Sequence, residues 1–156
     1  MMFKRFALLL FVLATAVPGL TTAATADSAA VMATVNQFVD GFNKGDTKMG
    51  IGACASPASI IDEFGRHQWV GPAACADWAR DYAADDARQG ITGGIVTLGK
   101  PWHVDVNGAV AYVVVPATYA YKQRGKSVEE SGSVWTLVLK KSAAGWRITA
   151  WAWAAH

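Results

Sequence analysis

The sequence predicts an α+β domain in which N-terminal helices pack on a curved, mostly antiparallel sheet. Apolar residues recur at helical spacing from Val31 to Phe42, and the pattern changes to alternation after Ile91. The Asn107-Gly108 pair, the strongest hairpin signal in the chain, lies between two alternating segments. Helices therefore come first and strands follow, which is the order of a segregated α+β fold.

Residues 1–26 have the pattern of an export signal. Two basic residues precede an uncharged apolar run over residues 6–17, and Ala24-Thr25-Ala26 forms an A-x-A cleavage site. Such a run makes about 18 Å of helix against roughly 30 Å of bilayer hydrocarbon, so we expect no stable membrane anchor. We expect a periplasmic or extracellular protein, cleaved near Ala26, with one domain over residues 27–156.

Cleavage at that site changes the charge balance. The full chain has 14 Lys and Arg against 12 Asp and Glu, and loss of Lys4 and Arg5 leaves 12 of each. A neutral domain lacks the basic excess of a nucleic-acid binder, so no nucleic-acid partner is expected. The three His are dispersed, and neither a metal motif nor a phosphate or dinucleotide motif occurs. We expect no metal and no cofactor.

The two cysteines, Cys54 and Cys75, are expected to form a disulfide. An even number of Cys in an oxidising compartment favours a bridge, and closing a loop of about 20 residues adds roughly 3 kcal/mol. The alternative is two buried thiols that pack as small apolar groups. Because the chain has no C-x-x-C motif and no His at ligand spacing, thiol catalysis and metal binding are disfavoured.

Three helices and a short strand pair are expected before the main sheet. Glycine, proline and capping residues bound the helices, and the strand pair separates the second helix from the third. The expected helices cover residues 27–44, 46–55 and 72–89, and the strand pair covers 59–64 and 67–70.

Four strands are expected after Ile91, the last three in an antiparallel meander. Gly99 and Pro101 are expected to bend or bulge the first strand. A polar loop is expected over residues 122–130 and a turn over 142–145. The expected strands cover residues 94–106, 109–121, 132–141 and 146–155.

Four local motifs carry a family resemblance. They are Phe38-Val39-Asp40-Gly41-Phe42-Asn43-Lys44-Gly45-Asp46, Ser59-Ile60-Ile61-Asp62-Glu63-Phe64, Gly71-Pro72 and Gly145-Trp146-Arg147-Ile148. Together with the element order, they resemble the NTF2-like superfamily, most closely its SnoaL-like branch, over residues 27–156. The resemblance implies a sheet that curls around the helices into a cone with a pocket at its open end. It implies no single activity, because this fold hosts isomerases, cyclases, dehydratases, hydrolases and non-catalytic modules.

The resemblance also implies that residues 62–69 line or rim the pocket, where ketosteroid isomerase-like members carry a carboxylate base. Asp62 and Glu63 occupy this region, and strand alternation predicts that only one of them faces inward, without deciding which. Apolar neighbours raise the pKa of a carboxyl by desolvation, which suits a general base. His67 is the candidate proton-transfer partner. The alternatives are a solvent-exposed acid at a strand end and a solvent-exposed turn histidine.

Two other parts of the isomerase pattern are missing. The oxyanion-donating Tyr of the first helix corresponds to Phe38 here, and the buried acid of a late strand falls at residues 135–137, which contain no carboxylate. Removing one oxyanion donor costs about 10²–10³ in rate, so that mechanism is disfavoured. The candidate ligand-binding residues are Trp69, Tyr119, Tyr121 and Trp135, with core packing as the alternative for Trp135.

The last strand is rich in tryptophan. Trp151 and Trp153 share one face, and Trp146 has the opposite parity, so both faces are expected to carry indoles. One face would meet the core or pocket, and the other would form a dimer surface, since exposed apolar patches mark interfaces.

The sequence therefore supports a secreted protein that binds a small, largely apolar molecule in an aromatic pocket. Asp62 or Glu63, with His67, would supply polar contacts and acid–base chemistry. The alternative is a non-catalytic interaction or homodimerisation module that uses the Trp-rich sheet face. The sequence leaves open whether the protein is an enzyme.

Overall fold

The computed structural model describes residues 19–155, with side chains described from Thr25 onward. Most of the expected export signal therefore lies outside the described residues. Within the described range lie three helices and seven strands: α1 (Gly19–Lys44), α2 (Thr47–Gly52), β1 (Cys54–Ile61), β2 (Gln68–Gly71), α3 (Ala74–Gln89), β3 (Ile91–Leu98), β4 (His103–Asn107), β5 (Val110–Gln123), β6 (Lys126–Ser142) and β7 (Gly145–Ala154).

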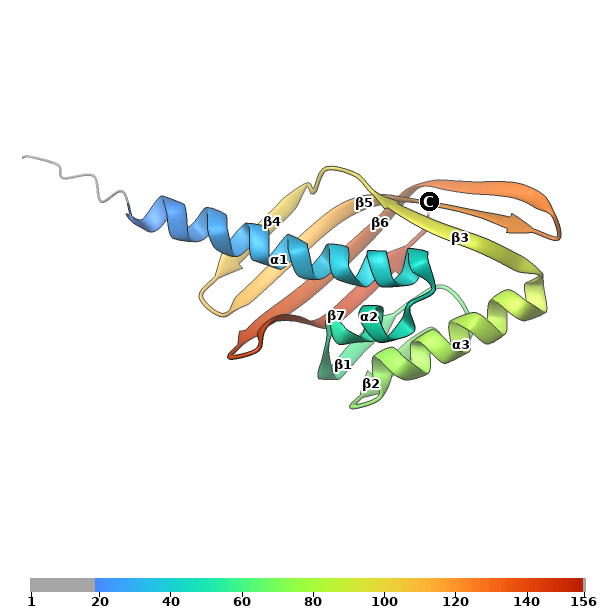
Figure 1. Ribbon diagram of the computed structural model, residues 1–156, viewed down its shortest axis with the longest axis horizontal. Helices are drawn as coiled ribbons and strands as arrows, with labels where there is room; N and C mark the ends of the chain where they lie inside the picture. Colours follow the sequence, from blue (N-terminus) through green and yellow to red (C-terminus); the bar gives the residue numbers. More distant parts are fainter. Residues whose placement is uncertain (1–18, 156) are drawn as a thin grey trace, which may run out of the picture.

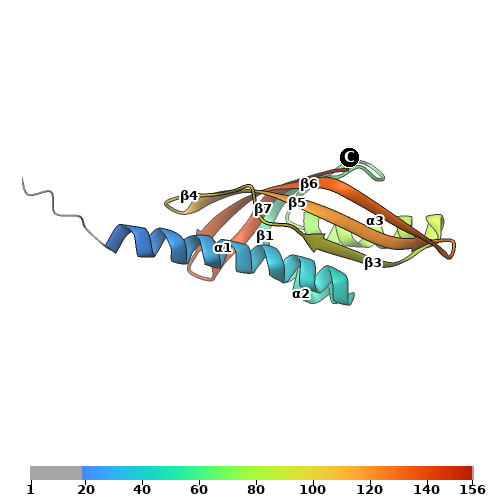
Figure 2. The same cartoon turned by 90° about the horizontal axis from the view of Figure 1, so that it is seen from above.

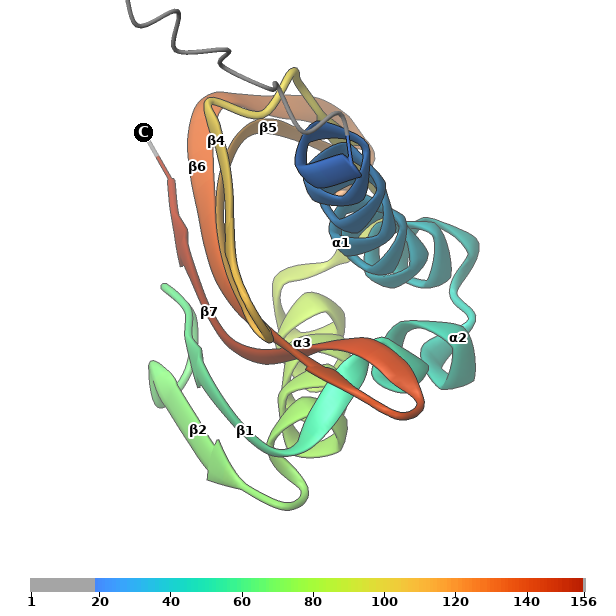
Figure 3. The same cartoon turned by 90° about the vertical axis from the view of Figure 1, so that its left-hand side faces the viewer.

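The strands form one sheet in the order β2-β1-β7-β6-β5-β3, and β4 also pairs with β5. The β1–β7 pair is parallel and the other pairs are antiparallel. The helices cover one face of the sheet, which curls around them (Figures 1 and 3). Figure 2 shows that the long strands β5 and β6 bend along their length. The predicted architecture and the predicted β5–β6–β7 meander are both confirmed.

The apolar stripe of α1 faces the sheet as its spacing predicts. Val31 and Val35 are fully buried, and Phe38 and Val39 are nearly so. The helix begins at Gly19 rather than at a cap near Asp27, so the predicted start is too late. Asp27 instead forms an ion pair with Lys141 of β6, with 2.6 Å between Oδ1 and Nζ. No helix within the described residues is long and apolar enough to cross a membrane.

The segment after α1 contains one confirmed prediction and one wrong one. Asp46 caps α2 as predicted, since its side chain accepts a hydrogen bond from the Met49 backbone N–H at 2.9 Å. The helix ends at Gly52, however, and β1 begins at Cys54, so the helix predicted to Ala55 is too long. Pro57 lies inside β1, where the pairing with β7 is irregular and needs no ladder hydrogen bond from proline.

Two predictions in the main sheet are wrong. The strand predicted over 94–106 is split into β3 and β4, because the segment around Pro101 leaves the ladder. The polar loop predicted over 122–130 is a tight hairpin in which Gln123 pairs with Lys126. Its central residues, Arg124 and Gly125, both have positive φ, as two-residue hairpin turns require, but Arg-Gly is a weaker signal than Asn-Gly.

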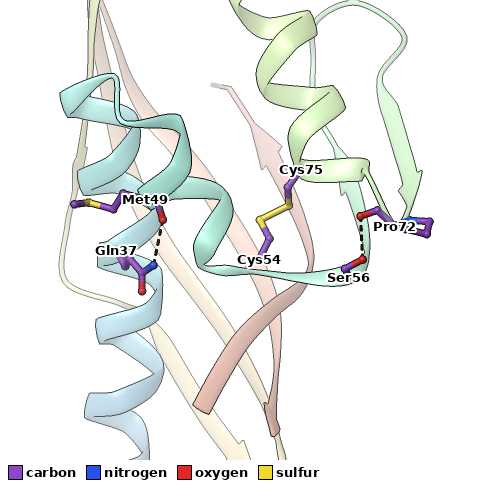
Figure 4. The surroundings of a disulfide bond; sticks show 6 residues. All are labelled: Gln37, Met49, Cys54, Ser56, Pro72 and Cys75. Atoms are coloured by element: carbon purple, nitrogen blue, oxygen red, sulfur yellow. Dashed lines mark hydrogen bonds between the residues drawn. A yellow bond between two sulfur atoms is a disulfide. The ribbon is translucent and has the colours of Figure 1, made fainter. Parts of the chain in front are cut away.

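The predicted disulfide between Cys54 and Cys75 is present. Figure 4 shows that it joins the start of β1 to the first turn of α3. Nearby, the Ser56 hydroxyl donates a hydrogen bond to the Pro72 carbonyl at 3.0 Å (Figure 4). The beginning of α3 is therefore tied to β1 both covalently and by hydrogen bonding.

The prediction that both faces of β7 carry indoles is wrong. Trp146, Trp151 and Trp153 all lie on the face toward the helices, where Trp151 pairs with Leu137 of β6. The register skips Thr149, an extra residue that forms a bulge and inverts the alternation, so Trp146 joins the side of Trp151. The Trp-rich surface of the dimer hypothesis is therefore not on the outer face of the sheet.

Candidate functional site

A pocket of about 340 Å³ opens between the helices and the inner face of the sheet. We define the pocket floor as the lining residues that are buried and the pocket rim as those that are half-buried or exposed. The floor consists of Phe38, Val39, Asp62, Trp78, Trp135 and Trp151. The polar part of the rim consists of Glu63, Tyr82, Asp85, Asp86, Gln89, Tyr119, Tyr121 and Glu130.

Four aromatic rings make up most of the floor. Phe38 of α1 lies 5.4 Å from Trp135 of β6 and 5.7 Å from Trp78 of α3, measured between ring centroids. Trp78 in turn lies 5.1 Å from Trp151 of β7, edge to face. Interlocked rings from two helices and two strands make an apolar surface of fixed shape. The indole N–H groups of Trp135 and Trp151 have no acceptor among the described residues.

Asp62 is the one carboxylate of the floor and is 8% exposed. Its Oδ2 accepts a hydrogen bond from Trp78 Nε1, and its Oδ1 accepts one from the Glu63 backbone N–H, both at 2.8 Å. Burial raises the pKa of Asp62 to about 6, although both hydrogen bonds act in the opposite direction. A carboxyl with this pKa exchanges its proton readily near neutral pH, as a general acid or base must.

Glu63 also lines the pocket, contrary to the prediction that only one of the two acids would face inward. The alternation argument does not apply, because β1 ends at Ile61 and both acids lie in the turn before β2. Asp62 turns toward the floor and Glu63 stays exposed on the rim. Partial burial raises the pKa of Glu63, and the negative charge of Glu130 raises it further.

The structure places two predicted site residues away from the pocket. His67 is exposed and adopts a positive φ of 63°, and its Nδ1 lies 3.1 Å from the Asp62 backbone carbonyl oxygen. Trp69 is fully buried, and its Nε1 donates a hydrogen bond to Asp81 Oδ2 at 2.9 Å. Neither residue belongs to the pocket lining, whereas Tyr119, Tyr121 and Trp135 do.

A hydrogen-bonded group on the rim was missed by the sequence reasoning. The Tyr82 hydroxyl is hydrogen-bonded to the Tyr119 hydroxyl and to the Asp86 carboxylate. Burial raises the pKa of Asp86 to about 6, even though the bond from Tyr82 lowers it, and burial raises the pKa of Tyr119 to about 12. The i, i+4 spacing of Tyr82 and Asp86 on α3 is the sequence signal that relates them.

Glu130 was missed for a different reason. It pairs across the strands with Tyr119 and accepts a hydrogen bond from the Tyr121 hydroxyl at 2.8 Å. The sequence reasoning placed Glu130 in a loop, and a loop residue cannot be assigned a cross-strand neighbour. Within residues 19–155, no group of three or more His, Cys, Asp or Glu side chains has the geometry to hold a metal ion.

The sequence and the fold were compared with those of known proteins. No protein-family model matches the sequence, and no curated protein matches it significantly. Solved structures match well. A protein of unknown function from Mycobacterium tuberculosis is similar to this chain with a TM-score of 0.71 and 15% identity, over 88% of this chain and 76% of that one.

Two further solved structures carry more informative names. An NTF2-like superfamily protein from Salmonella enterica has a TM-score of 0.70 and 16% identity, over 84% of this chain and 92% of that one. A ketosteroid isomerase-like protein from Erwinia carotovora has a TM-score of 0.65 and 16% identity, over 83% and 95%. At these identities the likeness establishes architecture and not activity. With its helices on one face of a curved seven-stranded sheet, this chain has the NTF2-like fold.

Proposed function

We propose that this protein binds a small, largely apolar molecule in the pocket and that Asp62 exchanges a proton with it. The observation that carries the proposal is a buried carboxyl with a pKa of about 6 on the floor of an otherwise aromatic pocket. The volume, about 340 Å³, lies in the range of small-molecule sites. Acid–base catalysis is most efficient when the pKa of the group lies near the working pH.

The polar groups around Asp62 favour a ligand that carries an oxygen. Tyr82 and Tyr119 place hydroxyl groups at the rim, where they can donate hydrogen bonds to such an oxygen. One structure of the same fold is named a ketosteroid isomerase-like protein, and a ketosteroid is an apolar molecule that carries such an oxygen. Tyr82 of α3 and Tyr119 of β5 would supply the hydroxyl donor that α1 lacks, since Phe38 occupies the corresponding position on α1. Membership of the SnoaL-like branch is part of this proposal and rests on the sequence motifs.

The binding half of the proposal is tested by filling the pocket. Val96 of β3 lines the pocket, whereas the next residue, Thr97, is exposed and does not. Ligands from a fragment library, detected by ligand-observed NMR, should bind the wild type and Thr97→Phe but not Val96→Phe. Equal binding to both variants would place the ligands elsewhere and contradict the proposal.

The chemical half is tested at Asp62. Among ligands that bind, proton exchange with solvent at a carbon next to a carbonyl should be catalysed by the wild type. Removing a general base typically lowers the rate by about 10²–10⁴, so Asp62→Asn should retain binding and lose exchange. Undiminished exchange in Asp62→Asn would remove Asp62 from the mechanism and leave Glu63 as the next candidate.

We also propose that the protein is exported and cleaved near Ala26. The disulfide supports an oxidising compartment. Thr25 and Ala26 are exposed, and the first buried side chain of the described part of α1 is Val31, so cleavage would leave the core face of the helix intact. Intact mass of the protein recovered from the periplasm or medium tests this, since the uncleaved mass would contradict it.

A homodimer remains a separate proposal. The outer face of β5 presents Val110 and Tyr112, which are 43% and 45% exposed. Apolar groups on a sheet face are typical of an interface. Analytical ultracentrifugation should then show a dimer that Tyr112→Lys dissociates, and a monomeric wild type would exclude it.

A further inference from the structure

The lining of the pocket is strongly acidic. Five carboxylates contribute to it, Asp62 on the floor and four that we call the acidic rim: Glu63, Asp85, Asp86 and Glu130. No Lys, Arg or His is among the lining residues within the described part of the chain. The chain as a whole is not acidic, with 14 Lys and Arg against 12 Asp and Glu. The negative charge is therefore concentrated at this pocket.

The acidic rim is brought together from three elements. Glu63 comes from the turn after β1, Asp85 and Asp86 from α3, and Glu130 from β6. Their charges act on one another, since Glu130 raises the pKa of Glu63 and Asp85 raises that of Asp86. A protein gains no stability from gathering like charges, so this arrangement points to a bound group of opposite charge.

Several acidic residues outside the pocket form ion pairs with Lys or Arg, whereas few acids of the rim do. Asp77 and Asp81 pair with Arg80, and Asp27 pairs with Lys141. On the rim, Asp85 pairs with Arg88 at 2.6 Å. Across residues 19–155, no ion pair is formed by the other three rim acids, Glu63, Asp86 and Glu130.

The aromatic residues of the pocket favour the same kind of ligand. Tyr119 and Tyr121 stack with 4.8 Å between ring centroids, directly beside Glu130, and Tyr82 adjoins Asp86. Ring faces attract cations, and this attraction strengthens as water is excluded. Carboxylates and ring faces together form the surroundings that an alkylammonium group prefers, whereas an anion would be repelled by every charge in the lining.

The cation that fits is organic rather than a metal ion. In the part of the chain that the structure describes, no three acidic, His or Cys side chains converge closely enough to coordinate a metal. The pocket is also far larger than an ion requires, and its floor is apolar.

We propose that the ligand is an amine: a largely apolar molecule whose body lies on the aromatic floor and whose ammonium group is held by the acidic rim. This inference rests on the proposed function, that the pocket binds a small molecule, and adds the ligand's charge class.

The experiment compares three probes of one shape and three charges. They are 4-phenylbutylamine, 4-phenylbutan-1-ol and 4-phenylbutyrate, titrated into the purified protein by isothermal titration calorimetry at neutral pH. The amine should bind about tenfold more tightly than the alcohol, and the carboxylate should bind most weakly. Added salt should reduce the advantage of the amine and leave the alcohol unaffected, because only the former involves charge.

Two adjacent residues of β6 provide a matched control. Glu130 lines the pocket, whereas Glu129 is exposed and does not. Glu130→Gln should weaken amine binding by about three- to tenfold without changing alcohol binding, and Glu129→Gln should change neither. Glu63→Gln, on a different element, should act like Glu130→Gln, which guards against a local folding defect in one variant.

The outcomes separate the inference from the proposed function. Equal affinities for amine and alcohol, or equal effects of Glu129→Gln and Glu130→Gln, would overturn the amine inference while leaving a small-molecule pocket. If none of the three probes binds and the fragment library also gives no ligand that Val96→Phe excludes, the proposed function fails as well.

Discussion

The pocket floor and the pocket rim are built from similar residues but under different physical conditions. The floor holds one carboxyl, Asp62, enclosed by rings and satisfied by two hydrogen bonds. The rim holds several carboxyls in partial contact with water, and most of them lack a basic partner among the described residues. Under the functions proposed above, the floor would exchange a proton at one defined group and the rim would attract a positively charged ligand.

The contrast is sharpest between two neighbours in the chain. Asp62 and Glu63 are adjacent carboxyls, and burial is the main cause of the raised pKa of each. For Glu63, on the rim, the negative charge of Glu130 raises the pKa further. Variants that separate floor from rim should therefore change different quantities: the free energy of unfolding and its pH dependence for the floor, and salt-sensitive affinity for the rim.

The largest expected effect is at the floor tryptophan. Trp151 is buried and contacts three other rings, so Trp151→Ala should lower the free energy of unfolding by about 4 kcal/mol. Trp153, two residues on, is only half-buried on the rim, and Trp153→Ala should cost about 1–2 kcal/mol. Urea denaturation measures both. Equal losses would mean that floor and rim do not differ in packing.

The disulfide should have the next largest effect. Cys54→Ser with Cys75→Ser opens a loop between residues 21 apart in sequence and should lower stability by about 3 kcal/mol. Because the bond ties β1 to α3, and these elements lead to Asp62 and Trp78, the floor should loosen first. Hydrogen exchange should show faster exchange at the Trp78 indole than at the β5–β6 ladder. Uniform acceleration would contradict this order.

Asp62 should give the protein a pH dependence with a definite sign. Its pKa is about 6 in the folded state against an ordinary 3.8, so between these values the folded protein binds more protons than the unfolded chain. Stability from this group is therefore full at low pH and lost as the pH rises through about 6, by about 3 kcal/mol in total.

The matched variants for this prediction are Asp62→Asn and Asp105→Asn. Asparagine cannot ionise, so Asp62→Asn should gain stability relative to the wild type as the pH rises from about 4 to about 7. Asp105 is exposed on β4, and its variant should follow the wild-type curve. Denaturation midpoints measured across this pH range test the prediction. If the stability of Asp62→Asn and of the wild type changed in parallel with pH, the pKa of Asp62 would not be raised in the folded protein.

The smallest effect is expected on the rim. Tyr121→Phe removes the hydroxyl that donates to Glu130, a half-exposed hydrogen bond, and should lower stability by about 0.5–1 kcal/mol. If the acidic rim binds amines, the same variant should leave amine affinity unchanged or higher, since Glu130 becomes freer to meet the ligand. A loss of stability comparable to that of Trp151→Ala would show that rim and floor fold as one unit.

The structure brings some of the candidate site residues together and not others, and particular residues show why. Strand order and parity place Tyr119, Tyr121 and Trp135 in the pocket, and the turn after β1 brings Asp62 and Glu63 to it. His67 is near Asp62 in the chain but turns outward, since its positive φ belongs to the turn that reverses the strand.

Other residues were missed because their role depends on partners distant in sequence. Asp86 and Glu130 are ordinary polar residues until α3 and β6 meet at the pocket. Trp69 was assigned to the ligand but packs in the core, where Asp81 accepts its N–H.

The sequence by itself determined most of the element types, the disulfide partners and the order of helices and strands. These follow from local causes: apolar spacing, capping residues, glycine at positive φ, and the presence of only two cysteines. Only the tertiary structure decided which tryptophans face inward and which acids share a pocket. A single bulge at Thr149 inverts the parity of β7, and the acidic rim exists only where three elements converge. Such convergence depends on packing between distant segments, which no local pattern records.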